Sequence, residues 1–129
     1  MAPRWSYVAL ALLTIAVGLG VHLHGAALGP RLRDAAGDAL WGTMMAWWIA
    51  AVIPTARRLT WGTIALAVCA AVETSQLYHT PALDALRRTT LGHLVLGSGF
   101  DPRDLAAYAV GVAAAVLLDP RLDRVRRRG

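Results

Sequence analysis

The sequence predicts an all-α protein, a polytopic membrane bundle of four transmembrane helices with a short re-entrant or interfacial segment on its outer side. Three observations predict this fold. The 129-residue chain is 57% hydrophobic, with a mean hydropathy of +0.48, which is too apolar for an ordinary soluble domain of this size. Its apolar residues form four runs close to membrane-spanning length. Its arginines gather at the ends of those runs. The length suits one domain over residues 1–129.

The four predicted spans cover 5–23, 38–53, 59–78 and 105–118, and a basic tail follows at 119–129. A helix needs ~20 residues, or ~17 at the shortest, to cross the hydrocarbon core. The second and fourth spans are therefore short, and interfacial tryptophans and arginines or local thinning of the bilayer would accommodate them. The stretch 91–100 is apolar and rich in glycine but too short to span, so we expect it to be re-entrant or interfacial.

Proline and aspartate mark the boundaries of these spans. Pro54 closes the second span, and Arg57-Arg58 form a short loop before the third. The motif Asp101-Pro102-Arg103-Asp104 predicts the start of the last helix, with aspartate as N-cap and proline at the first helical position. Asp119 and the proline after it close that helix.

The distribution of arginine predicts the orientation. The chain has no lysine, and eight of its 13 arginines fall on one side: Arg4, Arg57, Arg58 and the five of the tail. Cytoplasmic loops carry the excess of basic residues, so we expect both termini in the cytoplasm and the loops 24–37 and 79–104 outside. Arg4 before an apolar run is also typical of a signal peptide, but three further runs favour a retained span. Arginines at span ends suit lipid headgroups, and we expect no nucleic-acid partner.

Aromatic and small residues refine the predicted packing. Aromatic side chains near the span ends predict an aromatic belt at the two membrane surfaces. They are Trp5, Tyr7, Trp41, Trp61, Tyr78 and Tyr108. Small residues four positions apart let helix backbones approach closely in lipid. They are Ala16 and Gly20, Gly42 and Ala46, and Ala107, Gly111 and Ala115.

Polar residues that membrane spans rarely contain collect at the predicted outer face, and carboxylates inside apolar runs are costly enough to indicate function. Cys69, Glu73 and Gln76 follow i, i+4, i+7 spacing and share one face of the third span, which should face the bundle. Asp84 and Arg87 are three residues apart and would pair on a short helix. The predicted ligand-binding residues are Asp38, Glu73, Gln76, Asp84, Arg87, Arg88, Asp101 and Asp104.

Structural roles also fit these residues. Three aspartates stand at predicted helix starts and suit plain helix capping: Asp38, Asp101 and Asp104. Glu73 suits an ion pair with Arg87 or Arg88 that would hold the outer loop on the bundle. Both interpretations stay open at the level of sequence.

The chain carries no recognised catalytic or metal-binding motif. Four histidines fall on the predicted outer side, at positions 22, 24, 79 and 93, but their spacing is not that of a helical metal site. A P-loop, a nucleophile elbow and a dinucleotide fingerprint are all missing from the sequence. We therefore predict no catalytic residue, no metal and no cofactor.

A family resemblance appears in the same residues. The motifs Glu73-x-x-Gln76, Asp84-x-x-Arg87, Gly97-x-Gly99-Phe100 and Asp104-x-x-x-Tyr108-x-x-Gly111 resemble a family of small bacterial membrane proteins of unknown function, close to the VanZ-like proteins. Residues 37–41 are similar to the entry of its second span. Glu73, Gln76, Arg87, Asp104 and Gly111 follow the VanZ-like order, although Tyr108 stands where that pattern has asparagine. The resemblance implies a four-to-five-helix protein of the bacterial envelope. VanZ itself is associated with low-level resistance to a lipoglycopeptide antibiotic.

Three functional hypotheses follow. The leading one is a non-enzymatic protein of the bacterial cytoplasmic membrane whose outward-facing polar pocket binds an envelope lipid headgroup. The ligand would be an anionic phospholipid, a polyprenyl-phosphate or a glycolipid. Arg87 and Arg88 would contact a phosphate, and the carboxylates would accept hydrogen bonds from sugar hydroxyls or amines. The second is an enzyme acting on a lipid-linked substrate with Glu73 or Asp104 as general base. The third is a transport or assembly subunit, as a homo-oligomer or in a larger membrane complex.

Overall fold

A computed structural model describes residues 3–75, 77–78, 80–89 and 102–119. All regular elements in these residues are helical, which confirms the predicted all-α class. They are α1 (Pro3–His24), the 3₁₀ turn η1 (Gly25–Leu28), α2 (Pro30–Val52), α3 (Arg58–Ser75), α4 (Pro81–Arg88) and α6 (Pro102–Leu117). The predicted segment 91–100 and the arginine-rich tail from residue 120 onward lie outside the described residues.

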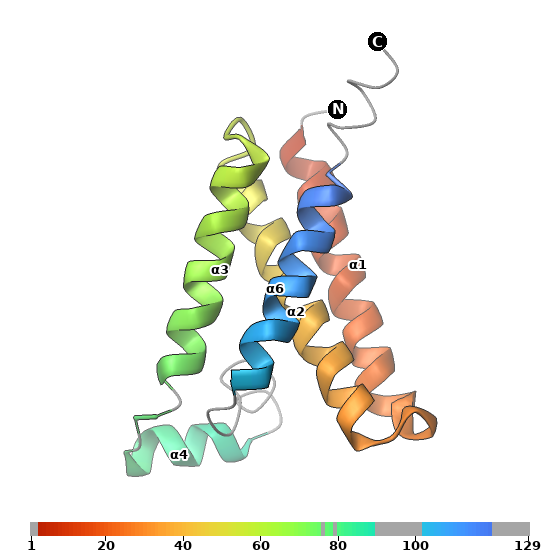
Figure 1. Cartoon of the computed structure of the whole chain (residues 1–129), viewed down its shortest axis with the longest axis vertical. Coiled ribbons are helices and arrows are strands. Elements are labelled where there is room, and N and C mark those ends of the chain that lie inside the picture. The colour runs from red at the N-terminus through yellow and green to blue at the C-terminus, as the bar shows by residue number, and fades with distance from the viewer. Residues whose placement is uncertain (1–2, 76, 79, 90–101, 120–129) are drawn as a thin grey trace.

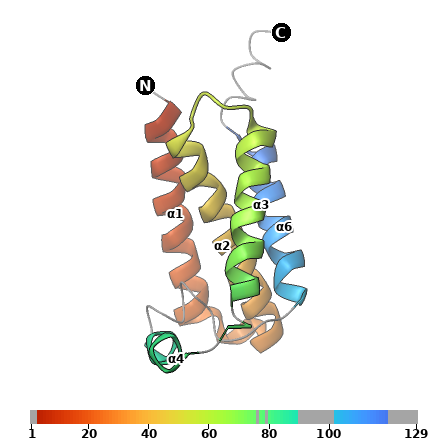
Figure 2. The ribbon, with the colours of Figure 1, turned by 90° about the vertical axis from the view of Figure 1, so that its left-hand side faces the viewer.

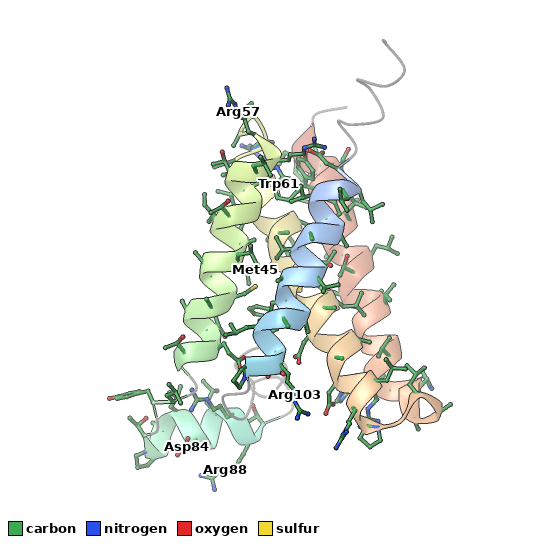
Figure 3. The ribbon with its side chains drawn as sticks, viewed as in Figure 1. Met45, Arg57, Trp61, Asp84, Arg88 and Arg103 are labelled. Carbon is green, nitrogen blue, oxygen red and sulfur yellow. The ribbon has the colours of Figure 1, made fainter. Side chains whose placement is uncertain are left out.

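The long helices α1, α2, α3 and α6 lie side by side in a bundle, and α2 contacts the other three (Figure 1). The short helix α4 runs across one end of this bundle, and it is seen nearly end-on when the view is turned (Figure 2). We call this end, which also holds η1 and the start of α6, the α4 end. The opposite end holds the α2–α3 connection, and we call it the Arg57 end (Figure 3).

Helix α2 starts eight residues earlier than predicted, at Pro30. Gly29 has a positive φ of 82°, which lets the chain turn sharply after η1, and Pro30 then occupies the first helical position. Asp38 consequently lies two turns inside α2, so its interpretation as a helix cap is wrong. Helix α3 ends at Ser75, three residues before the predicted end of the third span.

The start of α6 agrees with the sequence prediction where the chain is described. Pro102 occupies the first helical position, and Asp104 lies in the first turn. A carboxylate in the first turn is stabilised by the partial positive charge of the helix N-terminus. The predicted N-cap, Asp101, lies outside the described residues.

Two glycines allow α2 and α6 to touch. A Cβ atom on Gly111 would collide with the backbone of Ala39, and one on Gly42 would lie 2.7 Å from the carbonyl oxygen of Tyr108. The Thr43 hydroxyl donates across the same contact to the carbonyl oxygen of Gly111, at 2.7 Å. The small residues predicted to pack on α2 and α6 therefore do so. Those predicted on α1, Ala16 and Gly20, are exposed instead.

An aromatic cluster fills the bundle toward the Arg57 end. The ring of Tyr7 lies 5.9 Å from that of Trp47 and 6.0 Å from that of Trp61, measured between centroids. The Tyr7 hydroxyl donates to Asp119 Oδ1 at 2.7 Å, and both residues are buried. Tyr7 and Trp61 thus belong to the core and not to the predicted aromatic belt, because their rings pack against one another. Tyr108 is also buried.

The outside of the bundle is rich in large apolar side chains. Exposed examples come from α1, α3, α6 and the end of α2: Leu12, Leu13, Leu23, Val52, Leu59, Val110 and Leu117. Within the described residues one helical stretch, Arg4–Leu28, is long and apolar enough to cross a membrane, with a mean hydropathy of 1.9. Of the 18-residue segment within it that has this mean hydropathy, only 11% is buried inside the protein.

We expect Gly111→Ala to destabilise the bundle by about 1–3 kcal/mol, because the added methyl group must push α2 away from α6. The matched control is Gly20→Ala, where a Cβ atom meets nothing within 4 Å. That control should be neutral or more stable, since alanine favours a helix over glycine by roughly 0.5–1 kcal/mol. Thermal unfolding of the purified variants in detergent measures both. Equal stability of the two variants would contradict the close α2–α6 contact.

Candidate functional site: an acidic cluster at the α4 end

Glu73 is fully buried near the end of α3. Its Oε2 accepts a hydrogen bond from the Tyr108 hydroxyl of α6 at 3.0 Å. Cys69, one turn earlier, is buried as well, which confirms that this face of α3 looks into the bundle. Gln76, the third residue predicted on that face, lies outside the described residues.

A second pair of side chains joins α2 to α6. The carboxyl groups of Asp38 and Asp104 lie within hydrogen-bonding reach of each other, and Asp38 also interacts electrostatically with Glu73. Two carboxyl groups can share a hydrogen bond only when one of them holds a proton, because two carboxylates have only acceptors. We call Asp38, Glu73, Asp104 and Tyr108 the acidic cluster. It draws on three helices.

The close contact between α2 and α6 explains why these residues meet. Asp38 lies one turn before Gly42 on α2, and Asp104 and Tyr108 lie two turns and one turn before Gly111 on α6. Residues spaced by i, i+4 and i+7 share one helix face, so the side chains that precede the two glycines are directed into the same interface. Helix α3 then brings Glu73 against Tyr108.

Trp41 borders the acidic cluster. Its ring centroid lies 5.4 Å from that of Tyr108, with the two planes tilted by 50°. Trp41 is half-buried, whereas Tyr108 is buried. The cluster therefore combines hydrogen-bond acceptors with an aromatic face that is partly open.

Arg87 has a structural role at the end of α3. It is 6% exposed, and its guanidinium donates to the carbonyl oxygens of Tyr78 at 3.0 Å and Ser75 at 3.1 Å. The last carbonyl groups of a helix lack intrahelical partners and carry partial negative charge, so a cation stabilises them. Arg87 thus caps the C-terminus of α3 and fastens α4 to it.

Of the remaining predictions about α4, one is confirmed and one is wrong. The predicted pair on a short helix is confirmed, since Arg87 Nη1 lies 3.5 Å from Asp84 Oδ1 within α4. The predicted ion pair between Glu73 and either Arg87 or Arg88 is wrong for the described part of the chain. Arg87 is engaged at the end of α3, and Arg88 is exposed and points away from the bundle (Figure 3).

The chain matches the family described as Protein of unknown function (DUF2809) over residues 29–112. It belongs to that family. The matched region runs from the residue before α2 to the middle of α6, and it includes every member of the acidic cluster. No solved structure is significantly similar to the chain.

In this family member the structure brings together three of the eight predicted site residues, namely Asp38, Glu73 and Asp104. Tyr108 was not predicted to belong to the site. Its position four residues after Asp104 and three before Gly111 was the available signal, because that spacing places it on the packing face of α6.

Replacement of Tyr108 by phenylalanine should destabilise this DUF2809 protein by about 1–3 kcal/mol, because the buried Glu73 carboxyl loses a hydrogen-bond donor while the ring packing is kept. Tyr78→Phe is the matched control, since Tyr78 is 66% exposed. Chemical denaturation in detergent, followed by helical circular dichroism, measures both variants. A Tyr108→Phe protein as stable as Tyr78→Phe would show that the bond to Glu73 contributes nothing.

For Arg87→Gln we expect faster amide exchange over residues 75–88, by roughly tenfold or more, since charge-assisted hydrogen bonds typically contribute about 1.5–3 kcal/mol. The neighbouring Arg88→Gln removes an equal charge from an exposed position and should leave exchange near that of the parent. Hydrogen–deuterium exchange with mass spectrometry measures the exchange of both variants. Equal protection in the two variants would rule out Arg87 as the fastening of α4.

Proposed function

We propose that this chain is a multi-pass protein of the bacterial cytoplasmic membrane whose acidic cluster binds the polar headgroup of an envelope lipid or glycolipid without catalysing a reaction. Helices α1, α2, α3 and α6 are the four spans. The observation that carries the proposal is the convergence of three carboxyl groups and a phenol, from three helices, at one end of a bundle with an apolar exterior.

The distribution of side-chain size supports a membrane location. The buried core contains many small residues, among them Ala11, Ala46, Ala50, Ala65 and Ala115, whereas none of its described members is a leucine and many leucines are exposed. A soluble domain would bury its large apolar residues. In lipid, helices associate through small residues and leave large apolar ones to face the acyl chains.

The helix lengths fit the same interpretation. Helices α1 and α2 have 22 and 23 residues, which gives lengths of about 33–35 Å at ~1.5 Å per residue. The hydrocarbon core is ~30 Å thick. Helices α3 and α6, with 18 and 16 residues, would be accommodated by local thinning and by interfacial side chains.

The arginine bias supports an orientation with the Arg57 end in the cytoplasm. The start of α1, the α2–α3 connection and the end of α6 share that end (Figure 1), and eight of the 13 arginines belong to it or to the tail beyond it. Basic residues are enriched in cytoplasmic loops. The acidic cluster and α4 then face the outside of the cell.

The chemistry of the cluster indicates what the headgroup offers. Carboxyl oxygens accept hydrogen bonds from sugar hydroxyls or from an amine, and the partly open face of Trp41 suits either a sugar ring or a cation. Because Arg87 is engaged in capping, contact with a lipid phosphate falls to the exposed Arg88 at the same end (Figure 3).

The Asp38–Asp104 pair favours one second candidate. A protonated carboxyl beside an acceptor is the equipment of general acid–base chemistry. The chain would then be an enzyme acting on the same class of lipid, with Glu73 or Asp104 as the base.

Native mass spectrometry with lipid identification tests the proposal on protein extracted gently from its own membrane. We expect the parent to retain one phospholipid or glycolipid at fixed stoichiometry. Asp38→Asn should retain it at least about tenfold less, since a hydrogen bond to a charged group contributes roughly 1.5–3 kcal/mol. Asp34→Asn, an exposed aspartate on the same helix, is the matched control.

Each other outcome has a defined meaning. Only freely exchanging bulk phospholipids in the parent would overturn the lipid-binding proposal, as would equal retention by Asp38→Asn and Asp34→Asn. A chemically altered lipid that forms with the parent but not with Glu73→Gln would establish the enzymatic candidate in its place.

A further inference from the structure

Helix α4 buries one charged side chain, Arg87, and exposes most of its apolar ones. Arg87 is buried and Asp84 is half-buried, whereas Ala82, Ala85 and Leu86 are exposed. A helix on the surface of a soluble protein shows the opposite arrangement, with its apolar stripe facing the core. The exposed face of α4 therefore suits an apolar environment.

The surroundings of α4 at the same end are apolar too. Leu77 and Tyr78, in the connection from α3, are 63% and 66% exposed. The apolar exterior of α3, which includes Leu66, leads to this end of the bundle. Arg88 alone interrupts the outer side of α4 with a charge, and it points away from the bundle (Figure 3).

The orientation of α4 limits what its apolar face can meet. Its axis runs across the bundle, as the two perpendicular views show (Figure 1, Figure 2). If the four long helices cross a bilayer, α4 lies in the plane of that bilayer at the level of one surface. Amphipathic helices in this position sink their apolar face about 5–10 Å into the boundary between headgroups and acyl chains.

An eight-residue helix is too short to be stable alone, so α4 needs external fixing. The Thr80 hydroxyl caps its N-terminus by accepting from the Leu83 amide at 3.1 Å. Arg87 then attaches its other end to the carbonyl groups of Ser75 and Tyr78. These bonds use the charged side of α4 and leave the apolar side for another partner.

We propose that α4 is an interfacial anchor, whose Ala82, Ala85 and Leu86 face enters the headgroup–acyl boundary of the outer leaflet while Arg88 binds lipid phosphates. Charge complementarity and continuity with the apolar exterior of α3 select a lipid surface as the partner. The inference rests on the membrane location proposed above and adds a second lipid contact, separate from the acidic cluster.

Site-directed spin labelling tests this inference in nanodiscs of mixed phosphatidylethanolamine and phosphatidylglycerol. Single cysteines replace Leu86 on α4, Leu13 on the exposed side of α1 and Thr55 in the exposed α2–α3 connection, in a Cys69→Ala background. Power saturation compares collisions of each label with oxygen, which concentrates in lipid, and with a water-soluble nickel chelate. Ala85→Cys replaces Leu86→Cys if the latter fails to fold.

We expect the Leu86 label to favour oxygen over nickel several-fold more than the Thr55 label, and less than the Leu13 label. Nickel access at Leu86 equal to that at Thr55, with Leu13 still in lipid, would overturn the role of α4 and leave the membrane location standing. Nickel access at all three positions would overturn the membrane location itself. Exclusion of both reagents from Leu86 would show that protein covers this face, and would also overturn the inference.

Arg88→Gln supplies an independent readout of the headgroup contact. The oxygen preference at Leu86 should fall in this variant, and it should fall likewise in the parent when phosphatidylglycerol is left out. If the oxygen preference at Leu86 responds to neither change, that result would contradict the binding of phosphate by Arg88.

Discussion

The direct contact between the backbones of α2 and α6 is the constraint on which the rest of the structure depends. Gly42 and Gly111 leave no room for a side chain between the two helices, and Thr43 bonds across the gap to a backbone carbonyl. If the bundle lies in lipid, as proposed, no hydrophobic effect drives its helices together, and close packing of this kind would supply the attraction. It also fixes the relative rotation of α2 and α6, and thereby sets which side chains meet on the α4 side of the contact.

Those side chains are carboxyl groups, and the arrangement limits what their burial costs. An isolated carboxylate in an apolar interior is strongly unfavourable. In the acidic cluster Glu73 instead accepts a hydrogen bond from Tyr108, and the carboxyl groups of Asp38 and Asp104 lie within hydrogen-bonding reach of each other. The Arg57 end uses a similar device, where the hydroxyl of Tyr7 bonds to a buried aspartate and ties α1 to the end of α6. Among the described residues several carboxyl groups meet at the α4 end, which is why the function is proposed there.

The sequence predicted the all-helical class, the packing role of Gly42 and Gly111, and the inward face of α3, because each depends on local periodicity and residue size. It placed Asp38 at the start of the second helix because hydropathy marks where a run becomes apolar. Helix α2 begins earlier, where Gly29 and Pro30 permit a helix to start. The role of Arg87 depends on where α3 ends relative to α4, which is a tertiary fact.

Tyr7 and Trp61 were misassigned to an interfacial belt for a related reason. Position along a span determines the depth of a residue, but the rotation of its helix determines whether it faces lipid or a neighbouring ring. Trp5 and Tyr78, which are exposed near helix ends, retain positions that a belt would use.

The last turn of α3 connects the two lipid contacts proposed for this chain. Arg87 of α4 holds the carbonyl oxygen of Ser75, and Glu73 lies two residues earlier in the same helix. A force on α4 at the membrane surface therefore acts first on the turn that positions the Glu73 carboxyl against Tyr108. Arg87 attaches α4 to the end of α3 and to the connection after it through the carbonyl oxygens of Ser75 and Tyr78, while Asp84 holds the same guanidinium from within α4. The last turn of α3 would thus support both the headgroup contact at the acidic cluster and the contact of α4 with the outer leaflet. The geometry of each contact would depend on the other.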